Sequence, residues 1–152
     1  MKSILTSLSL FTIFMVQLTN AKMQTVNVSG TILCHGQRVM NMVIEMWEFD
    51  RWDDNDLLNV TMTNEQGEFS LTGEHDEFFA IEPFILLTHE CGAKDGCVKQ
   101  AQYYVPTHKI DRDYVMDHIA LDIYTNGEKT LCGNKVPNGY RNLLSQVETK
   151  SE

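Results

Sequence analysis

Hydrophobic and polar residues alternate with a period of two over most of this chain. In residues 25–34, Val26, Val28 and Ile32 fall on one side of the backbone, and mainly polar residues fall on the other. This alternation is typical of a β-strand with one face in a hydrophobic core. No long stripe with the 3.6-residue period of a helix precedes the C-terminal tail. The pattern therefore predicts an all-β protein.

Seven short segments carry the alternation, and turn-forming residues separate them. The predicted strands are residues 25–34, 42–49, 57–63, 68–72, 83–91, 99–105 and 117–125. Residues 107–115 are predicted to be an irregular crossover with room for one helical turn. Gly67 supplies permissive backbone before the fourth strand, whose Phe69 and Leu71 should face the core. About seven strands spaced in this way favour a two-sheet antiparallel sandwich.

The first 21 residues have the pattern of a secretory signal peptide. Lys2 gives a positive start, residues 4–18 are largely apolar, and Thr19 and Ala21 are small residues at a cleavage site. The apolar run is shorter than the roughly 20 residues that span a bilayer. We therefore expect removal of residues 1–21, a sandwich domain at 22–132, and a polar, flexible tail at 133–152. The protein should be secreted and extracellular, and should not span a membrane.

The chain is acidic, with 12 Lys and Arg residues against 21 Asp and Glu residues and a net charge of −9. This balance argues against nucleic acid and against polybasic attachment to anionic lipid, since both require Lys and Arg to meet phosphate. A basic protein partner stays compatible with it. The loop at residues 50–56 has four aspartates, but it lacks the spacing of a calcium loop. We expect no bound metal and no cofactor.

The four cysteines are Cys34, Cys91, Cys97 and Cys132. An even number in an oxidising compartment indicates two disulfides, and the absence of a C-x2-C pair argues against zinc. Cys91 and Cys97 flank a turn-like segment and are expected to pair with each other. That pairing leaves Cys34 for Cys132, although the exchanged connectivities stay open.

Two N-glycosylation sequons occur, at Asn27 and Asn59. Alternation places both asparagines on the polar side of their predicted strands. The sequence therefore predicts a glycoprotein.

Few residues suggest chemistry. Residues 75–77, His-Asp-Glu, could bind a metal or act in acid–base catalysis, but such a group in a polar loop is usually solvated. His89 is expected to be a hydrogen-bonded core residue. Trp47, Phe49 and Trp52 project from one predicted hairpin, where they either pack beneath its loop or form a candidate binding surface. No Gly-x-Ser-x-Gly elbow is present, and we expect no catalytic residues.

Several short motifs follow one another in an order that resembles a known family. They are Val28-x-Gly30-x-Ile32-Leu33-Cys34-x-Gly36, Thr63-Asn64-x-x-Gly67-x-Phe69-x-Leu71-x-Gly73, Ile81-Glu82-Pro83, Leu87-Thr88-His89-Glu90-Cys91 and Tyr104-Val105-Pro106. Together they are similar to the nematode transthyretin-like family of secreted β-sandwich proteins, over residues 25–132. The resemblance implies a transthyretin-like fold and an extracellular protein that binds other proteins or lipid surfaces.

The resemblance favours a secreted binding protein without catalytic activity, and two other functions stay open. One is a carrier of a small apolar ligand. The other is 5-hydroxyisourate hydrolase, which shares the transthyretin sandwich and ends in Tyr-Arg-Gly-Ser. Tyr140-Arg141 is similar to part of that motif, but Asn142 and Leu143 replace its last two residues. The hydrolase is therefore the least favoured of the three functions.

Overall fold

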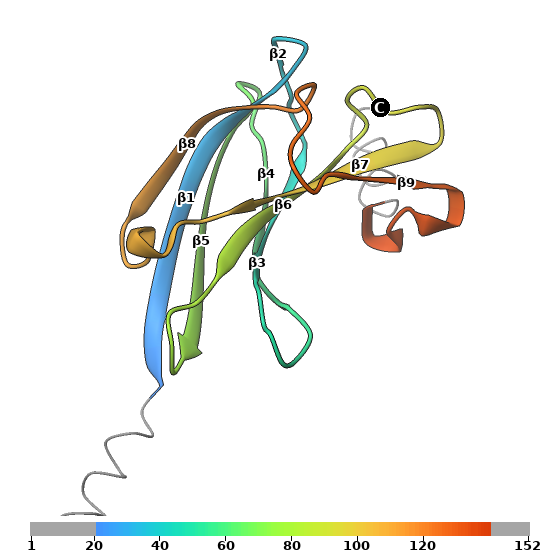
Figure 1. Cartoon of the computed structure of the whole chain (residues 1–152). Helices are drawn as coiled ribbons and strands as arrows, with labels where there is room; N and C mark the ends of the chain where they lie inside the picture. The colour runs from blue at the N-terminus through green and yellow to red at the C-terminus, as the bar shows by residue number, and fades with distance from the viewer. Residues whose placement is uncertain (1–20, 141–152) are drawn as a thin grey trace, which may run out of the picture.

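The computed structural model describes residues 21–140, which fold into two packed β-sheets (Figure 1). The first sheet contains β1 (Lys22–Cys34), β2 (Gln37–Arg38), β5 (Glu68–Glu77) and β8 (Asp113–Ala120). The second contains, in spatial order, β4 (Asp56–Met62), β3 (Val43–Glu48), β6 (Pro83–His89), β7 (Cys97–Tyr104) and β9 (Lys129–Cys132). The neighbouring strands are antiparallel except for β1 and β8. The predicted all-β, two-sheet sandwich is confirmed.

Two short strands, β2 and β9, were not predicted, and the strand predicted at 117–125 begins and ends earlier, as β8. After β7 the chain crosses from the second sheet to the first through the 3-10 helix η1 (Thr107–Lys109). It then enters the first sheet in the same direction as β1, so β8 and β1 are parallel. Asp111 fixes this crossover. Its backbone nitrogen donates to the Thr25 carbonyl at 2.7 Å, and its carboxylate accepts from the Thr25 nitrogen at 3.0 Å. The alternation of hydrophobic and polar residues cannot predict hydrogen bonds of this kind, which hold a crossover in place.

The hydrophobic core lies between the sheets and follows the predicted alternation on most strands. Val26, Val28 and Ile32 of β1 are buried, as are Phe69 and Leu71 of β5. The β4 strand is the exception. Alternation predicts Val60 and Met62 to face the core, but they are exposed because they pair with Glu45 and Val43, which face outward on β3. The register shifts between Met46 and Trp47, so Asn59 and Thr61 lie opposite the buried Met46 and Ile44 instead. The turn before β5 is as expected, with Gly67 at a φ of 69°.

The two disulfides are present, but their pairing corrects the expectation. Cys34 is bonded to Cys91, and Cys97 is bonded to Cys132. The predicted pairing was wrong because Cys97 begins β7, where it lies directly opposite Cys132 of β9. Since β9 was not predicted, this cross-strand pair could not be recognised.

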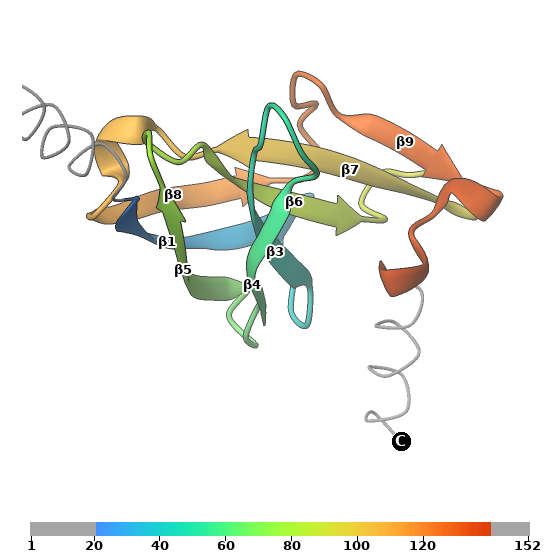
Figure 2. The same ribbon diagram turned by 90° about the horizontal axis from the view of Figure 1, so that it is seen from below.

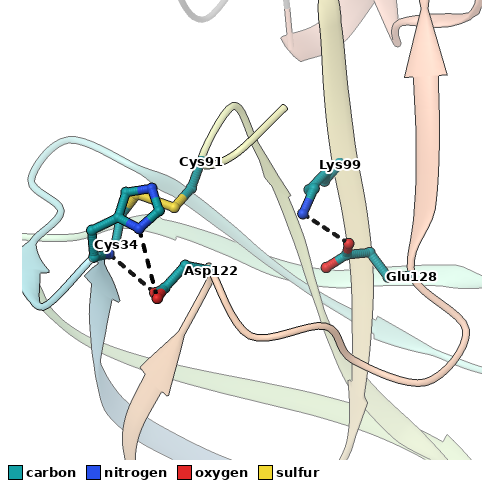
Figure 3. Close-up of a disulfide and its surroundings, with 6 residues drawn as sticks. Cys34, Cys91, Lys99, Asp122 and Glu128 are labelled. Atoms are coloured by element: carbon teal, nitrogen blue, oxygen red, sulfur yellow. Dashed lines mark hydrogen bonds and ion pairs between the residues drawn. A yellow bond between two sulfur atoms is a disulfide. The ribbon is translucent and has the colours of Figure 1, made fainter. Parts of the chain in front are cut away.

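The two disulfides link different parts of the sandwich. Cys34–Cys91 joins the end of β1 to the segment after β6, and so connects the two sheets (Figure 3). His35 donates its backbone nitrogen to the Asp122 carboxylate at 3.0 Å beside this bond. Cys97–Cys132 lies within the second sheet, where β7 and β9 extend past the first sheet (Figure 1 and Figure 2).

The structure continues beyond Cys132. A 3-10 helix, η2, covers Gly133–Lys135, and Val136 is buried. Within the described residues, no helix is long and apolar enough to cross a membrane. Residues 1–20 of the predicted signal peptide and residues 141–152 of the predicted tail lie outside the described residues.

Candidate functional site

A groove of about 640 Å³ lies at one end of the sandwich, between the β3–β4 loop and the β5–β6 turn. Both segments lie at the lower end of the molecule in Figure 1, and the β1–β2 turn lies at the upper end. We call it the acidic groove; it is lined by Glu48, Phe49, Asp50, Arg51, Trp52, Asp53, Glu77, Phe79, Ala80 and Glu82.

Two aromatic side chains in the acidic groove are almost fully exposed. Trp52 in the β3–β4 loop is 96% exposed, and Phe79 in the β5–β6 turn is 80% exposed. Phe78, next in the chain to Phe79, is also exposed, and the two rings meet edge to face. Aromatic residues usually bury most of their surface, so an exposed group of this size is a candidate contact surface.

The three predicted aromatic residues therefore have different positions. Trp52 projects into solvent at the acidic groove. Phe49 also lines the groove but is half-buried. Trp47 is half-buried on β3, where its indole nitrogen donates to Glu45 at 2.9 Å. Phe79 was missed because the pattern of β5 was followed only to residue 72, although the strand continues to Glu77.

The charge of the acidic groove is mainly negative. Its one cationic side chain within the described residues, Arg51, forms an ion pair with Glu82 at 2.8 Å. Glu48, Asp50, Asp53 and Glu77 supply the remaining carboxylates. A ligand that fits the groove should therefore combine positive charge with an apolar or planar group that can stack on an aromatic ring.

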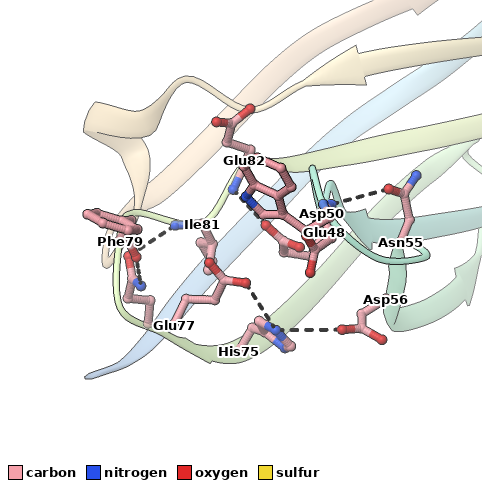
Figure 4. Close-up of polar contacts among 11 residues, drawn as sticks. Glu48, Asp50, Asn55, Asp56, His75, Glu77, Phe79, Ile81 and Glu82 are labelled. Atoms are coloured by element: carbon pink, nitrogen blue, oxygen red, sulfur yellow. Dashed lines mark hydrogen bonds and ion pairs between the residues drawn. The ribbon is translucent and has the colours of Figure 1, made fainter. Parts of the chain in front are cut away.

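Two rows of inward-facing residues lead from the core to the floor of the acidic groove. Ile44 and Met46 precede Glu48 on β3, and Leu71 and Gly73 precede His75 on β5, in each case at alternate positions. Glu48 is 2% exposed, although it is a carboxylate. Desolvation by burial is the largest cause that raises its pKa, and the nearby Glu77 raises it further. Figure 4 shows Glu48 close to His75 and Glu77.

A second, mostly apolar cavity of about 270 Å³ lies at the opposite end, beside the Cys34–Cys91 bond. Met42, Leu121 and Tyr140 contribute to its lining. His89, which also lines it, is buried as predicted, but neither ring nitrogen has a hydrogen-bond partner within residues 21–140. Desolvation is the main cause that lowers the pKa of His89. Burial, together with the nearby Glu90 carboxylate, raises the pKa of Tyr140 to about 12.

The side chains of the two sequon asparagines both form hydrogen bonds with Thr72. Asn59 donates its side-chain amide to the Thr72 carbonyl at 2.6 Å, and Asn27 accepts from the Thr72 hydroxyl at 2.8 Å. Asn59 is exposed and Asn27 is half-buried. Glycosylation at both positions stays a prediction.

Comparison with known proteins decides the family. The sequence pattern that defines the transthyretin-like family matches residues 29–106. Transthyretin-like protein 16 of Caenorhabditis elegans is 42% identical over 113 residues, which cover 74% of this chain and 86% of that protein. This chain belongs to the transthyretin-like family. The family predicted from the ordered motifs is therefore confirmed.

Other similar proteins are more distant. Transthyretin-like protein 1 of the same nematode is 32% identical over 95 residues, which cover 56% of this transthyretin-like chain and 60% of that protein. Transthyretin-like protein 5 is 27% identical over 115 residues, which cover 73% of this chain and 78% of that protein. A solved 9R-lipoxygenase from Cyanothece PCC8801 aligns at 14% identity and a TM-score of 0.43, over 77% of this chain and 20% of that one. That likeness is too low to bear on function.

Proposed function

We propose that this transthyretin-like protein is secreted, has no catalytic activity, and binds a basic extracellular protein through the acidic groove. The observation that supports the proposal is the exposure of Trp52 and Phe79, two large aromatic side chains on the two walls of one groove. Aromatic anchors carry much of the binding energy of protein interfaces when a partner covers them.

Charge favours a protein over a lipid surface as the partner. The chain has a net charge of −9, and the groove that holds the two aromatic rings is also lined by Asp50 and Asp53, which form no ion pair among the described residues. Anionic lipid head groups would be repelled, whereas Lys and Arg side chains of a protein would gain both ion pairs and cation–π contacts. Binding should therefore weaken as salt concentration rises.

A quantitative pull-down from nematode surface extract tests the groove. Immobilised wild-type protein is compared with a Trp52→Ala/Phe79→Ala double variant, and the bound proteins are identified by mass spectrometry. An Ile123→Ala/Tyr124→Ala variant is the matched control, because these two apolar residues are also exposed but lie outside the groove. We expect a basic protein that the wild type and the control retain and the groove variant loses.

Two results would contradict this proposal. Equal recovery of every protein by the wild type and the groove variant would dismiss the groove as the contact. Groove-dependent binding to vesicles of phosphatidylserine and phosphatidylcholine, without a protein partner, would make a lipid surface the ligand.

Secretion is tested separately. Expression of the full-length sequence in insect cells should release a chain whose N-terminal residue is Lys22. Peptide N-glycosidase should lower its apparent mass, and the Asn27→Gln and Asn59→Gln variants should each remove one step of that shift. Retention of the uncleaved chain inside the cells would contradict the predicted leader.

One observation favours a second function, the carriage of a small ligand. The cavity beside Cys34–Cys91 is mainly apolar, and the buried His89 adds two nitrogens that have no hydrogen-bond partner in the part of the chain that the structure describes. A small apolar ligand with one polar group would fit this combination. Displacement of a fluorescent apolar probe, abolished by a Leu121→Trp variant that fills the cavity, would support the carrier function.

A further inference from the structure

We infer that Glu48, His75 and Glu77 form a binding site for one zinc ion at the floor of the acidic groove. This inference does not depend on the proposed protein partner. The ion would bridge the two sheets, since Glu48 belongs to β3 of the second sheet and the other two residues belong to β5 of the first. Asp56, the first residue of β4, stands beside the same imidazole, but its carboxylate does not belong to the group of three ligand atoms that lie close to one another.

The distances between the ligand atoms suit a small ion. One atom each of Glu48, His75 and Glu77 lie within 4.8 Å of one another. The His75 Nε2 atom is 3.8 Å from Glu77 Oε1 and 3.7 Å from Asp56 Oδ2 (Figure 4). Ligands about 2.1 Å from a tetrahedral zinc ion lie about 3.4 Å apart, so side-chain shifts of about 1 Å would complete the site.

The buried carboxylate is the independent observation that points to a cation. Glu48 is 2% exposed, and its Oε1 atom accepts from the Glu82 backbone nitrogen at 3.2 Å. Its other oxygen, Oε2, is buried and has no hydrogen-bond partner among the described residues. A buried carboxylate oxygen without a partner is unfavourable, because it has lost hydration without gaining a replacement. A bound cation would supply that replacement.

The ligand types favour zinc over calcium. Calcium takes six to eight oxygen ligands, whereas this cluster offers an imidazole nitrogen and few carboxylates. Zinc accepts mixed nitrogen and oxygen ligands in a four-coordinate geometry. The His75 and Glu77 side chains are 24% and 29% exposed, so the ion could enter from the acidic groove.

The sequence named His75 and Glu77 among possible metal ligands but not Glu48, and the strand positions explain why. His75 and Glu77 fall on the inward row of β5, which begins with Phe69 and Leu71, and Glu48 ends the inward row of β3. Residues 75–77 were assigned to a polar loop, where such a cluster is normally solvated. The signal that could have revealed the site is a charged residue at an inward position of each of two facing strands.

Zinc titration of tag-free, secreted protein with both disulfides tests the site. The metal is removed with EDTA, and zinc binding is measured by isothermal titration calorimetry. We expect one zinc ion per chain and a melting temperature that rises with zinc concentration. Cobalt, as a spectroscopic substitute, should give the visible absorption bands of a four-coordinate site.

Two variants and one control separate the site from surface histidines. His75→Asn and Glu48→Gln should each weaken zinc binding at least tenfold and remove the cobalt bands. Glu48→Gln retains an oxygen acceptor for the Glu82 nitrogen, so it should fold even if His75→Asn does not. His35→Asn is the matched control, because His35 also lies beside a carboxylate, that of Asp122, but is exposed. It should bind zinc as the wild type does.

Several results would overturn the zinc site. These are no zinc binding at 100-fold excess over protein, unchanged affinity in folded Glu48→Gln, and a loss of affinity in His35→Asn equal to that in His75→Asn. Binding of calcium in preference to zinc would also contradict it.

Discussion

The two ends of the sandwich hold the sheets together in different ways. At the β1–β2 turn, the Cys34–Cys91 bond joins the sheets covalently, and an apolar cavity lies beside it. At the acidic groove no disulfide joins the sheets, and the β5–β6 turn of the main chain connects them. There, Gln24 of the first sheet donates to the Phe79 carbonyl at 2.7 Å, and the Glu48 carboxylate is buried facing His75 and Glu77.

If the groove binds a partner as proposed, this difference separates stability from recognition. The disulfide end has a fixed geometry that does not depend on salt, pH or ligands in an oxidising compartment. The acidic end concentrates charge and exposed aromatic surface, so its stability should respond to protons and cations. A sandwich with one covalently fixed end can tolerate a polar, less stable opposite end.

The largest expected effect is the loss of the inter-sheet disulfide. A Cys34→Ala/Cys91→Ala variant should lose about 4 kcal/mol of unfolding free energy, because the bond closes a loop with a sequence separation of 57 residues. Denaturant unfolding of purified protein measures this loss.

The second disulfide is the control for that prediction. A Cys97→Ala/Cys132→Ala variant should lose less, since β9 is an edge strand that can detach while the two sheets stay packed. Hydrogen exchange in this variant should increase at β9 and stay slow in β1. Equal losses for the two variants would show that the link between the sheets has no special role.

A smaller loss is expected at Gly73, where the sheets approach closely without a covalent link. A Cβ atom at this position would lie 2.6 Å from the Met46 sulfur and 2.9 Å from the Leu58 Cβ atom. Gly73→Ala should therefore lower the unfolding free energy by about 1–3 kcal/mol. Gly139→Ala is the control, since no atom of residues 21–140 lies within 4 Å of a Cβ atom there. A Gly73→Ala protein as stable as the wild type would show that β3 and β4 can move away from β5.

The pH dependence of stability should show the buried carboxylate at the acidic end. The folded-state pKa of Glu48 is raised above the ordinary value of 4.5, so the unfolded chain loses this proton first as pH rises. Stability should therefore fall from pH 4.5 up to the folded pKa, when metal is removed. Glu48→Gln should abolish this decline and melt at a higher temperature than the wild type at pH 7.

Two aspartates outside the groove give the opposite pH dependence and serve as an internal reference. Backbone hydrogen bonds from Thr25 and His35 are the largest causes that lower the pKa values of Asp111 and Asp122 below 3.8. Their contribution to stability is present above pH 3.8 and is lost as pH falls, in the wild type and in Glu48→Gln alike. A Glu48→Gln protein with the same decline above pH 4.5 as the wild type would contradict the assignment to Glu48.

The smallest effect is expected at Trp52. Because this side chain is 96% exposed, Trp52→Ala should change the unfolding free energy by less than about 0.5 kcal/mol. Trp47→Ala, which removes a half-buried ring and its hydrogen bond to Glu45, should cost more. Thermal unfolding of both variants checks the order. A large loss for Trp52→Ala would mean that the loop packs on this ring and would weaken its assignment to a contact surface.

The sequence predicts the sandwich because alternation reports directly which residues face the core. It places Val26, Ile44 and Leu71 correctly, and the ordered motifs identify the family. It does not reveal β9, a four-residue strand without a buried residue, and the disulfide pairing was wrong for that reason.

The candidate site was predicted only in part. Trp52 was selected from the hairpin, but Phe79 comes from a turn about 27 residues later in the chain and meets it only in the folded protein. The part of Glu48 in the site was not predicted for a similar reason. Its inward position is visible in the sequence, yet a carboxylate there is interpretable only once the facing row of β5 is known to continue to Glu77.

The edge strand β4 also exposes apolar side chains to solvent. Leu57, Val60 and Met62 are exposed along it, and an open edge with apolar side chains can recruit a strand from another molecule. Asn59 lies on the same edge strand but on its opposite face, since it pairs with the buried Met46. An oligosaccharide at this asparagine, where glycosylation stays a prediction, would obstruct the addition of a strand to the open edge and so protect the chain against aggregation.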